Sequence, residues 1–308
     1  MKILVATDKP FAPVAVSRIR EVAEKGGHQL FLLEKYRTPQ ELHEAVKDAD
    51  AMIVRSDIID AAVVAAAQKL KIVVRAGAGY DNLDLQACSS RNIVAMNTPG
   101  QNSNAVAELA FGMMLYLARG GFDGKTGSEL LGKTLGLHAF GNVGKCMAKI
   151  AAGFGMEIFA FDPFVDSKSI TDAGVTPVDT LEELYSKCQY VSLHIPANDK
   201  TRKSIGEKLL SMMSEGAVLV NTARKEVINE EELIRVMEKR TDFRYISDIA
   251  PDNAAVFTEK FTGRFFFTPK KMGAQTEEAN VNAGVAAARQ IVDFFATGNE
   301  TFRVNKNK

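Results

Sequence analysis

Two adjacent lysines near the C-terminus are the first residues whose type could do chemistry. Lys270 and Lys271 lie in FTPKKMGAQT, residues 267–276, shortly before Gly273. All four histidines precede this segment: His28, His43, His138 and His194. A proton transfer run from this loop would therefore use an amine in place of an imidazole. If the loop is extended, neighbouring side chains point to opposite sides, so only one lysine can face a substrate.

A second stretch whose residues could have a chemical role is LGLHAFGNVG, residues 135–144. It follows a strand pattern, opens a helix pattern and precedes a strand that ends at Asp162. Gly141 and Gly144 take the second and third places of the dinucleotide-binding fingerprint. Ala139 replaces the first glycine, which is acceptable if the turn avoids positive φ. The arrangement indicates a pyrophosphate at a helix N-terminus and a carboxylate for the ribose hydroxyls.

The predicted choice between NAD and NADP rests on Asp162. A carboxylate that faces the 2′ position accepts hydrogen bonds from a hydroxyl but repels a phosphate, which favours NAD over NADP. The alternative is that Asp162, which precedes Pro163, only ends a strand and starts a turn.

Short apolar β-type runs alternate with helical patterns along most of the chain. The first set covers residues 2–7, 29–34, 51–56, 71–77 and 92–97. After a long helical run at 105–119, the second set covers residues 133–139, 156–161, 189–195, 217–221 and 245–249. This alternation predicts an α/β fold with two doubly wound parallel sheets, because crossover helices cover both faces of each sheet.

The last helical pattern, residues 277–298, has no sheet of its own, so we expect it to return to the first sheet. The prediction is a flavodoxin-like substrate domain of residues 1–98 plus 276–308 and a Rossmann NAD-binding domain of residues 99–275. Two chain crossings would then form a hinge, with a cleft between the domains. The helix at 105–119 is expected to form a homodimer.

Charge and composition narrow the class of partner. The 38 basic and 38 acidic side chains cancel, which argues against nucleic acid and against anionic membranes. No stretch approaches the roughly 20 apolar residues of a membrane span, and the first apolar run is too short for a signal peptide, so we expect a cytoplasmic protein. Cys88, Cys146 and Cys188 are widely spaced, which argues against disulfides and structural zinc. We expect no metal.

Taken together, these stretches resemble the D-isomer-specific 2-hydroxyacid dehydrogenase family over nearly the whole chain, and most closely its short D-3-phosphoglycerate dehydrogenase branch. In that branch lysine takes the place of the catalytic histidine, and the C-terminal regulatory domain is missing. The matching stretches are RAGAGYDNLDL (75–85), TPGQNSNAVAE (98–108), GNVGK (141–145), FDPF (161–164), VSLHIP (191–196), NTARKEVI (221–228) and KMGAQTEEAN (271–280).

The resemblance implies two catalytic residues. Arg224 would bind the substrate carboxylate and polarise the reacting carbonyl, a role that suits a planar guanidinium. Alternatively, it is a surface charge beside a turn. Lys271, two residues before Gly273, matches the family's histidine, whereas Lys270 replaces its proline. The alternative for both lysines is a solvated loop.

A further departure concerns the histidine's partner. Family members place a glutamate five residues after an aspartate like Asp248, and that position is Asn253 here. A lysine has no tautomer to fix, so the two changes are consistent with each other. Asp252 could still contact the lysine.

The resemblance also assigns the remaining site residues. Gly77, Ala78 and Gly79 would bind the substrate carboxylate through backbone N–H groups. Arg55, Ser56 and Asn102 are candidates for its phosphate end, and the alternative for Arg55 is a surface arginine that begins a loop. Asp248 is expected near the nicotinamide carboxamide. The expected cofactor-binding residues are Gly141, Asn142, Val143, Gly144, Asp162, His194, Ile195, Pro196, Thr222, Ala223, Asp248, Gly273 and Ala274. Of these, His194 could instead be a hydrogen-bonded core residue.

The implied function is NAD-dependent oxidation of D-3-phosphoglycerate to 3-phosphohydroxypyruvate, the first step of serine biosynthesis. Two alternatives stay open. One is a reductase of hydroxypyruvate, glyoxylate or another 2-oxo acid. The other is a non-enzymatic relative that senses NAD and acts through partner proteins. Arg224 together with Lys271 favours an enzyme, because a sensor needs neither.

Overall fold

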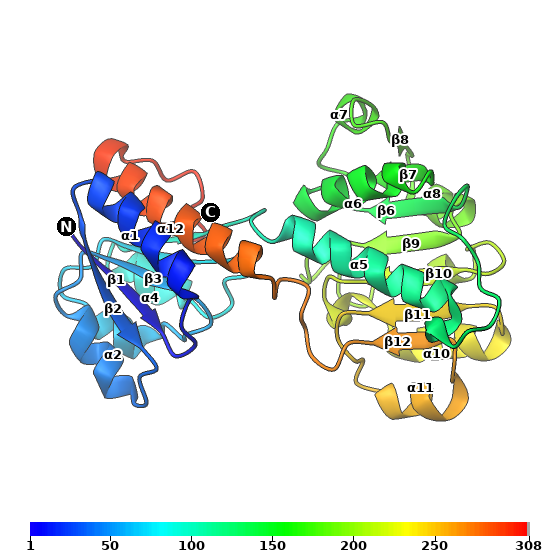
Figure 1. Ribbon diagram of the computed structural model, residues 1–308, viewed down its shortest axis with the longest axis horizontal. Coiled ribbons are helices and arrows are strands. Elements are labelled where there is room, and N and C mark those ends of the chain that lie inside the picture. The colour runs from blue at the N-terminus through cyan, green and yellow to red at the C-terminus, as the bar shows by residue number, and fades with distance from the viewer. Residues whose placement is uncertain (307–308) are drawn as a thin grey trace. The chain divides into compact units, whose positions relative to one another are not determined.

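The computed structural model describes residues 1–306. Its contacts divide the chain into two compact units, Met1–Asn102 with Ala274–Lys308, and Ser103–Gly273 (Figure 1). The domain limits expected from the sequence, 1–98 plus 276–308 and 99–275, lie close to this division. The roles assigned to the two domains stay predictions.

The first unit contains a five-stranded, fully parallel sheet of order β2-β1-β3-β4-β5. Its strands are β1 (Lys2–Thr7), β2 (Gln29–Glu34), β3 (Ala51–Val54), β4 (Ile72–Arg75) and β5 (Val94–Asn97). Its helices are α1 (Pro13–Lys25), α2 (Pro39–Val46), α3 (Ala61–Ala66), α4 (Leu85–Ser90) and α12 (Glu277–Thr297).

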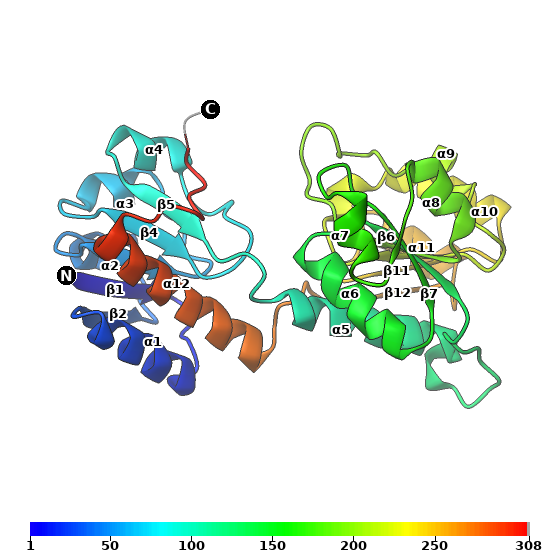
Figure 2. The same cartoon turned by 90° about the horizontal axis from the view of Figure 1, so that it is seen from above.

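Both faces of this first sheet are covered. Ile3 and Val5 of β1 pack into a core with α1 and α12, whereas Leu4 and Ala6 pack into a core with α2, α3 and α4. This division follows from the alternation of side chains along a strand. Figure 2 shows α1 and α12 on one face of the sheet and α3 and α4 on the other. The last helix therefore returns to the first sheet, as expected.

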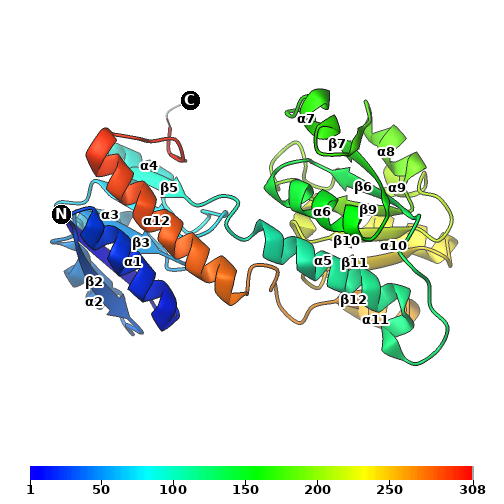
Figure 3. The same cartoon turned by 45° about the horizontal axis from the view of Figure 1, so that its top comes forward.

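The second unit contains a seven-stranded parallel sheet of order β12-β11-β10-β9-β6-β7-β8. Its strands are β6 (Thr134–His138), β7 (Glu157–Phe161), β8 (Thr176–Pro177), β9 (Tyr190–Leu193), β10 (Val218–Asn221), β11 (Arg244–Ser247) and β12 (Phe265–Phe267). Its helices are α5 (Ser103–Ala118), η1 (Gly120–Phe122), α6 (Asn142–Gly153), α7 (Ser167–Thr171), α8 (Leu181–Lys187), α9 (Glu207–Leu210), η2 (Lys225–Val227), α10 (Glu230–Lys239) and α11 (Ala254–Lys260). Figure 3 shows α5 and α6 side by side on one face of this sheet.

The predicted fold class is confirmed, because both sheets are parallel and lie between helices. The sequence analysis missed the two edge strands, β8 and β12. β8 has only two residues, and its Pro177 is tolerated because an edge strand leaves one side unpaired. β12 is the three-residue run FFF, too short to show a period.

Neither a membrane-spanning helix nor a cluster of metal ligands occurs in the part of the chain that the structure describes. None of its helices combines the length and the apolar character that a membrane crossing requires. Residues 1–306 also hold no group of three or more His, Cys, Asp or Glu side chains that could bind a metal ion.

Candidate functional site

The glycine-rich turn joins β6 to α6. Gly141 precedes the first residues of α6, Asn142 and Val143, and a Cβ at Gly141 would meet no atom within 4 Å. A Cβ at Gly144 would lie 2.5 Å from the carbonyl oxygen of Ala139. Gly144 is thus required for the close approach of helix and strand, whereas Gly141 leaves open space at the helix N-terminus. Both are properties of a pyrophosphate-binding turn.

Ala139 corrects one expectation. The substitution of the first glycine was expected to be acceptable in a turn without positive φ, but Ala139 has φ = 87°. Its N–H donates to the carbonyl of Phe161 at 2.9 Å, which ties the turn to the end of β7, and its own carbonyl oxygen faces Gly144. A non-glycine residue in the left-handed region costs roughly 1–2 kcal/mol. The turn keeps the geometry of the fingerprint and stores this strain.

Asp162 follows β7 and lies against the same turn. Its Oδ2 accepts a hydrogen bond from the N–H of Phe140 at 2.8 Å, and its Oδ1 accepts one from the N–H of Phe164 at 2.8 Å. The carboxylate therefore starts a turn, as the alternative reading proposed, and also contacts the glycine-rich segment. Each oxygen keeps acceptor capacity for a further donor such as a ribose hydroxyl.

Two polar atoms beyond the ends of β9 and β10 are buried without a hydrogen-bond partner in residues 1–306. They are Nε2 of His194 and Oγ1 of Thr222. The alternative, that His194 is a hydrogen-bonded core residue, therefore does not hold for Nε2. The residue as a whole is partly exposed. Burial, aided by nearby His138, lowers the pKa of His194 to about 3, so its ring is neutral. Ile195 is buried and Pro196 is exposed.

Lys271 and Arg224 meet at one backbone carbonyl. Nζ of Lys271 donates to the carbonyl oxygen of Ala223 at 2.6 Å and to that of Thr222 at 3.3 Å. Nη1 of Arg224 donates to the same oxygen of Ala223 at 3.3 Å. The side chain of Lys270 makes no hydrogen bond or ion pair with any residue in 1–306. The structure thus brings together the two residues proposed to be catalytic.

The pKa of Lys271 is lowered from its ordinary value. Burial of the ammonium group is the largest cause and the charge of Arg224 the second, while Asp248 and Glu226 oppose the shift. Much of the Lys271 residue is exposed. Nζ itself lies against two backbone carbonyls. Desolvation at that end of the side chain therefore determines that the pKa is lowered.

Asp248 has a role that the sequence analysis missed. Its Oδ1 accepts hydrogen bonds from the N–H of Met272 at 2.8 Å and from Oγ1 of Thr268 at 3.2 Å, and its Oδ2 accepts one from the N–H of Gly273 at 2.8 Å. A Cβ at Gly273 would lie 2.7 Å from Oδ2. The buried carboxylate therefore fixes the backbone that directly follows Lys271, and a glycine is needed for this close approach.

Arg55 follows β3 in the other unit. Its Nη1 donates to the carbonyls of Lys9 and Pro10 at 3.0 and 3.1 Å, and its Nη2 donates to Oδ1 of Asn280 at 2.7 Å. The guanidinium lies 5.0 Å from the ring centre of Phe11. Arg55 is therefore not a free surface arginine. These contacts leave its Nε and one N–H of Nη2 as possible donors to a substrate.

The Gly77–Gly79 turn follows β4. Gly77 has φ = 151°, and a Cβ there would lie 1.5 Å from Nη1 of Arg75, so no other residue fits without a shift. The carbonyl of Ala78 accepts a hydrogen bond from Nδ2 of Asn97 at 2.6 Å. The guanidinium beside this turn was not anticipated from the sequence. Three other expected site residues also lie in the first unit: Ser56, Asn102 and Ala274.

Comparisons with known proteins identify the family. A family model described as D-isomer specific 2-hydroxyacid dehydrogenase, NAD binding domain, matches residues 111–264. The chain belongs to this family. The matched residues, described as the family's NAD-binding domain, lie within the unit that holds the glycine-rich turn.

Individual relatives carry two kinds of name. D-3-phosphoglycerate dehydrogenase of Methanocaldococcus jannaschii is 36% identical over 82% of this chain and 51% of the relative. Hydroxypyruvate reductase of Thermotoga maritima is 34% identical over 85% of this chain and 90% of the relative. The crystal structure of NAD⁺-bound 3-phosphoglycerate dehydrogenase of Entamoeba histolytica has 51% identity and a TM-score of 0.87 over 100% of this chain and 99% of the other. The chain thus spans about half the length of the Methanocaldococcus relative.

The position of the family's glutamate holds an asparagine with another partner. Nδ2 of Asn253 donates to Glu230 at 3.2 Å, and the N–H of Asn253 donates to the same carboxylate at 3.1 Å. Asp252, which could have contacted Lys271, forms an ion pair with Lys225 instead. Lys271 therefore has backbone carbonyls as its hydrogen-bond partners, in place of a carboxylate.

The residues of the second unit fit NAD. Gly141 leaves open space at the start of α6, Asp162 offers carboxylate oxygens, and Thr222 and His194 present unpartnered polar atoms. Which of these atoms contact the dinucleotide stays a prediction.

Proposed function

We propose that the chain oxidises D-3-phosphoglycerate to 3-phosphohydroxypyruvate with NAD, the first step of serine biosynthesis. The observation that carries the proposal is the meeting of Arg224 and Lys271 at the carbonyl of Ala223. The guanidinium of Arg224, a group suited to binding carboxylates, thus lies beside an amine whose pKa is lowered. The names of the Methanocaldococcus and Entamoeba relatives support the phosphorylated substrate.

The proposed chemistry divides between the two residues. Bound NAD supplies the acceptor for the hydride that leaves the carbon bearing the hydroxyl group. Arg224 binds the substrate carboxylate and stabilises negative charge on the reacting oxygen through charge-assisted hydrogen bonds. Neutral Lys271 accepts the hydroxyl proton at Nζ, and in the reverse reaction its ammonium form returns the proton.

The lowered pKa of Lys271 helps the oxidative direction. At an unperturbed pKa near ~10.4, deprotonating the ammonium at neutral pH costs about 4–5 kcal/mol. Burial and the charge of Arg224 both reduce this cost. The two carbonyl acceptors hold Nζ in place, while the charges of Asp248 and Glu226 offset part of the lowering of its pKa.

We further propose that Gly77, Ala78 and Gly79 bind the carboxylate and that Arg55, with Ser56 and Asn102, binds the phosphate. The free Nε and the remaining N–H of Nη2 on Arg55 supply the donors for this contact. The homodimer and the cytoplasmic location are proposed from the sequence alone.

A second candidate is reduction of hydroxypyruvate or glyoxylate. The observation that favours it is the Thermotoga hydroxypyruvate reductase, because the chain spans 90% of that relative. D-3-phosphoglycerate differs from D-glycerate, and 3-phosphohydroxypyruvate from hydroxypyruvate, only by a phosphate group. These matched pairs of compounds therefore separate the two activities.

The deciding assay follows NADH absorbance with D-3-phosphoglycerate and D-glycerate, and with 3-phosphohydroxypyruvate, hydroxypyruvate and glyoxylate. The proposal expects a higher kcat/KM for the phosphorylated member of each pair. A higher value for the unphosphorylated members would establish the second candidate. No turnover with any substrate, with NAD binding intact, would favour a sensor.

A further inference from the structure

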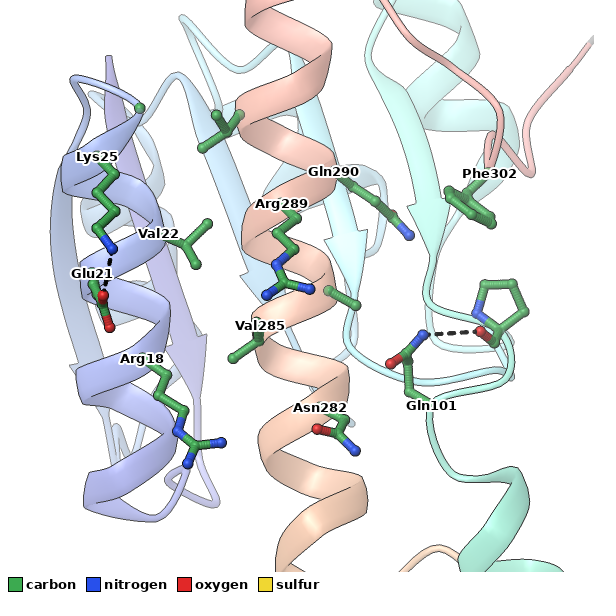
Figure 4. A pocket seen from close by; sticks show the side chains of 14 residues that line it. Arg18, Glu21, Val22, Lys25, Gln101, Asn282, Val285, Arg289, Gln290 and Phe302 are labelled. Carbon is green, nitrogen blue, oxygen red and sulfur yellow. Dashed lines mark hydrogen bonds and ion pairs between the residues drawn. The ribbon is translucent and has the colours of Figure 1, made fainter.

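A cavity of about 860 Å³ lies on the first unit, whereas Arg224 and Lys271 belong to the second unit. Residues of α1, α12 and the chain around Pro99 line it, and every lining residue belongs to the first unit. The volume falls within the range of small-molecule sites. Figure 4 shows Arg18 extending from α1 toward α12, and Arg289 on the face of α12.

The charge of this cavity is strongly one-sided. Three cationic side chains, Arg18, Lys25 and Arg289, line it together with one carboxylate, Glu21. Nζ of Lys25 forms an ion pair with Glu21 at 2.6 Å, which neutralises both. Arg18 and Arg289 make no hydrogen bond or ion pair with any residue in 1–306. Two guanidinium groups on neighbouring helices therefore remain to bind anionic oxygens.

The rest of the lining suits a small polar molecule. Side-chain amides of Gln101, Gln290 and Asn282 supply neutral hydrogen-bonding groups, and Val22 and Val285 supply an apolar wall. Guanidinium groups bind carboxylates and phosphates through paired hydrogen bonds. We infer that this cavity, named here the α1–α12 cavity, binds a small polyanion with at least two carboxylate or phosphate groups.

The test uses citrate and inorganic pyrophosphate as probes of the full chain saturated with NAD. Isothermal titration calorimetry at one ionic strength, balanced with sodium chloride, separates a specific site from general screening. Saturable binding of at least one probe is expected, and the tighter probe distinguishes a polycarboxylate ligand from a phosphate ligand.

Variants locate the binding. Arg18→Gln and Arg289→Gln should each weaken binding about 10-fold or more, because each removes a charge-assisted contact. The double variant should abolish it. Arg37→Gln, which changes an exposed arginine of the same unit outside the cavity, should bind like the parent. Arg55→Gln tests the proposed substrate site instead, because Arg55 does not line the cavity.

Three outcomes would overturn the inference. They are no saturable binding of either probe, full binding by the Arg18→Gln/Arg289→Gln double variant with its circular dichroism unchanged, or an equal loss in Arg37→Gln. A loss confined to Arg55→Gln would assign the anion to the proposed substrate site. None of these results depends on which 2-hydroxy acid the enzyme oxidises.

Discussion

Protonation of a buried histidine should destabilise the second unit at mildly acidic pH. His138 is 6% exposed, and its Nδ1 lies 3.3 Å from the hydroxyl oxygen of the buried Tyr185. Burial lowers the pKa of His138 from 6.5 to about 4, although Asp162 opposes the shift. In the unfolded chain His138 therefore binds a proton near pH 6.5, whereas in the folded chain it binds one only near pH 4. The contribution of the neutral His138 ring to stability is fully present above about pH 6.5, and it is lost as the pH falls from 6.5 toward 4.

The size of the effect follows from the two pKa values. At pH 5 the lost free energy of unfolding from His138 is about 2 kcal/mol relative to pH 7 or above, to within about a factor of two. His194 changes stability in the same direction, since its pKa is also lowered, to about 3. Proteins of this size are stabilised by only about 5–15 kcal/mol, so the change is measurable.

Urea unfolding followed by circular dichroism at pH 7 and pH 5 provides the assay. Carboxylates elsewhere also respond to pH, so the comparison is between the parent and His138→Gln. The variant should show a pH-dependent loss smaller by about 2 kcal/mol. His43→Gln, which changes a histidine of the first unit, should keep the full loss. An equal pH dependence in the parent and His138→Gln would refute the reasoning.

Three further predictions concern Asp162, Arg55 and the strained turn at Ala139. Asp162→Ala should narrow the preference for NAD over NADP mainly by weakening NAD, measured as KM for both cofactors; a parent that uses NADP equally well would remove the assignment. Arg55→Ala should weaken a phosphorylated substrate by roughly 1.5–3 kcal/mol more than its unphosphorylated partner, and a uniform loss would mean that Arg55 only supports the fold. Ala139→Gly should raise the free energy of unfolding by about 0.5–1 kcal/mol, because relief of strain exceeds the entropy cost of glycine; a loss would contradict that strain.

The sheets were predictable because strands of parallel sheets are continuous apolar runs. β1 and β2 begin and end where the apolar runs at 2–7 and 29–34 do. The return of α12 to the first unit was predictable for a related reason, since an apolar helix face must find a sheet to cover. Edge strands such as β8 escape this reasoning because two residues carry no period.

The details of the site depend on contacts between distant parts of the chain. Asp248 bonds to Gly273, 25 residues away, and Arg55 bonds to Asn280, 225 residues away. No local pattern encodes such pairs. The positive φ of Ala139 was also hidden, because an alanine gives no sign of the left-handed region. The resemblance to the family predicted Arg224 and Lys271 as a catalytic pair, whereas the groups that hold the two side chains required the structure.

The central claim is that Lys271, and not Lys270, carries the proton. The direct measurement is turnover of Lys271→Ala and Lys270→Ala in both directions, with NAD binding and circular dichroism as controls. Lys271→Ala should lose about 10²-fold or more, and its oxidation should lose the alkaline rise that reflects deprotonation of Lys271. Lys271→His should recover little, because Asn253 is bonded to Glu230 and cannot act as the family's glutamate. Lys270→Ala should stay near the parent. Full turnover by Lys271→Ala, with or without a loss in Lys270→Ala, would contradict the account.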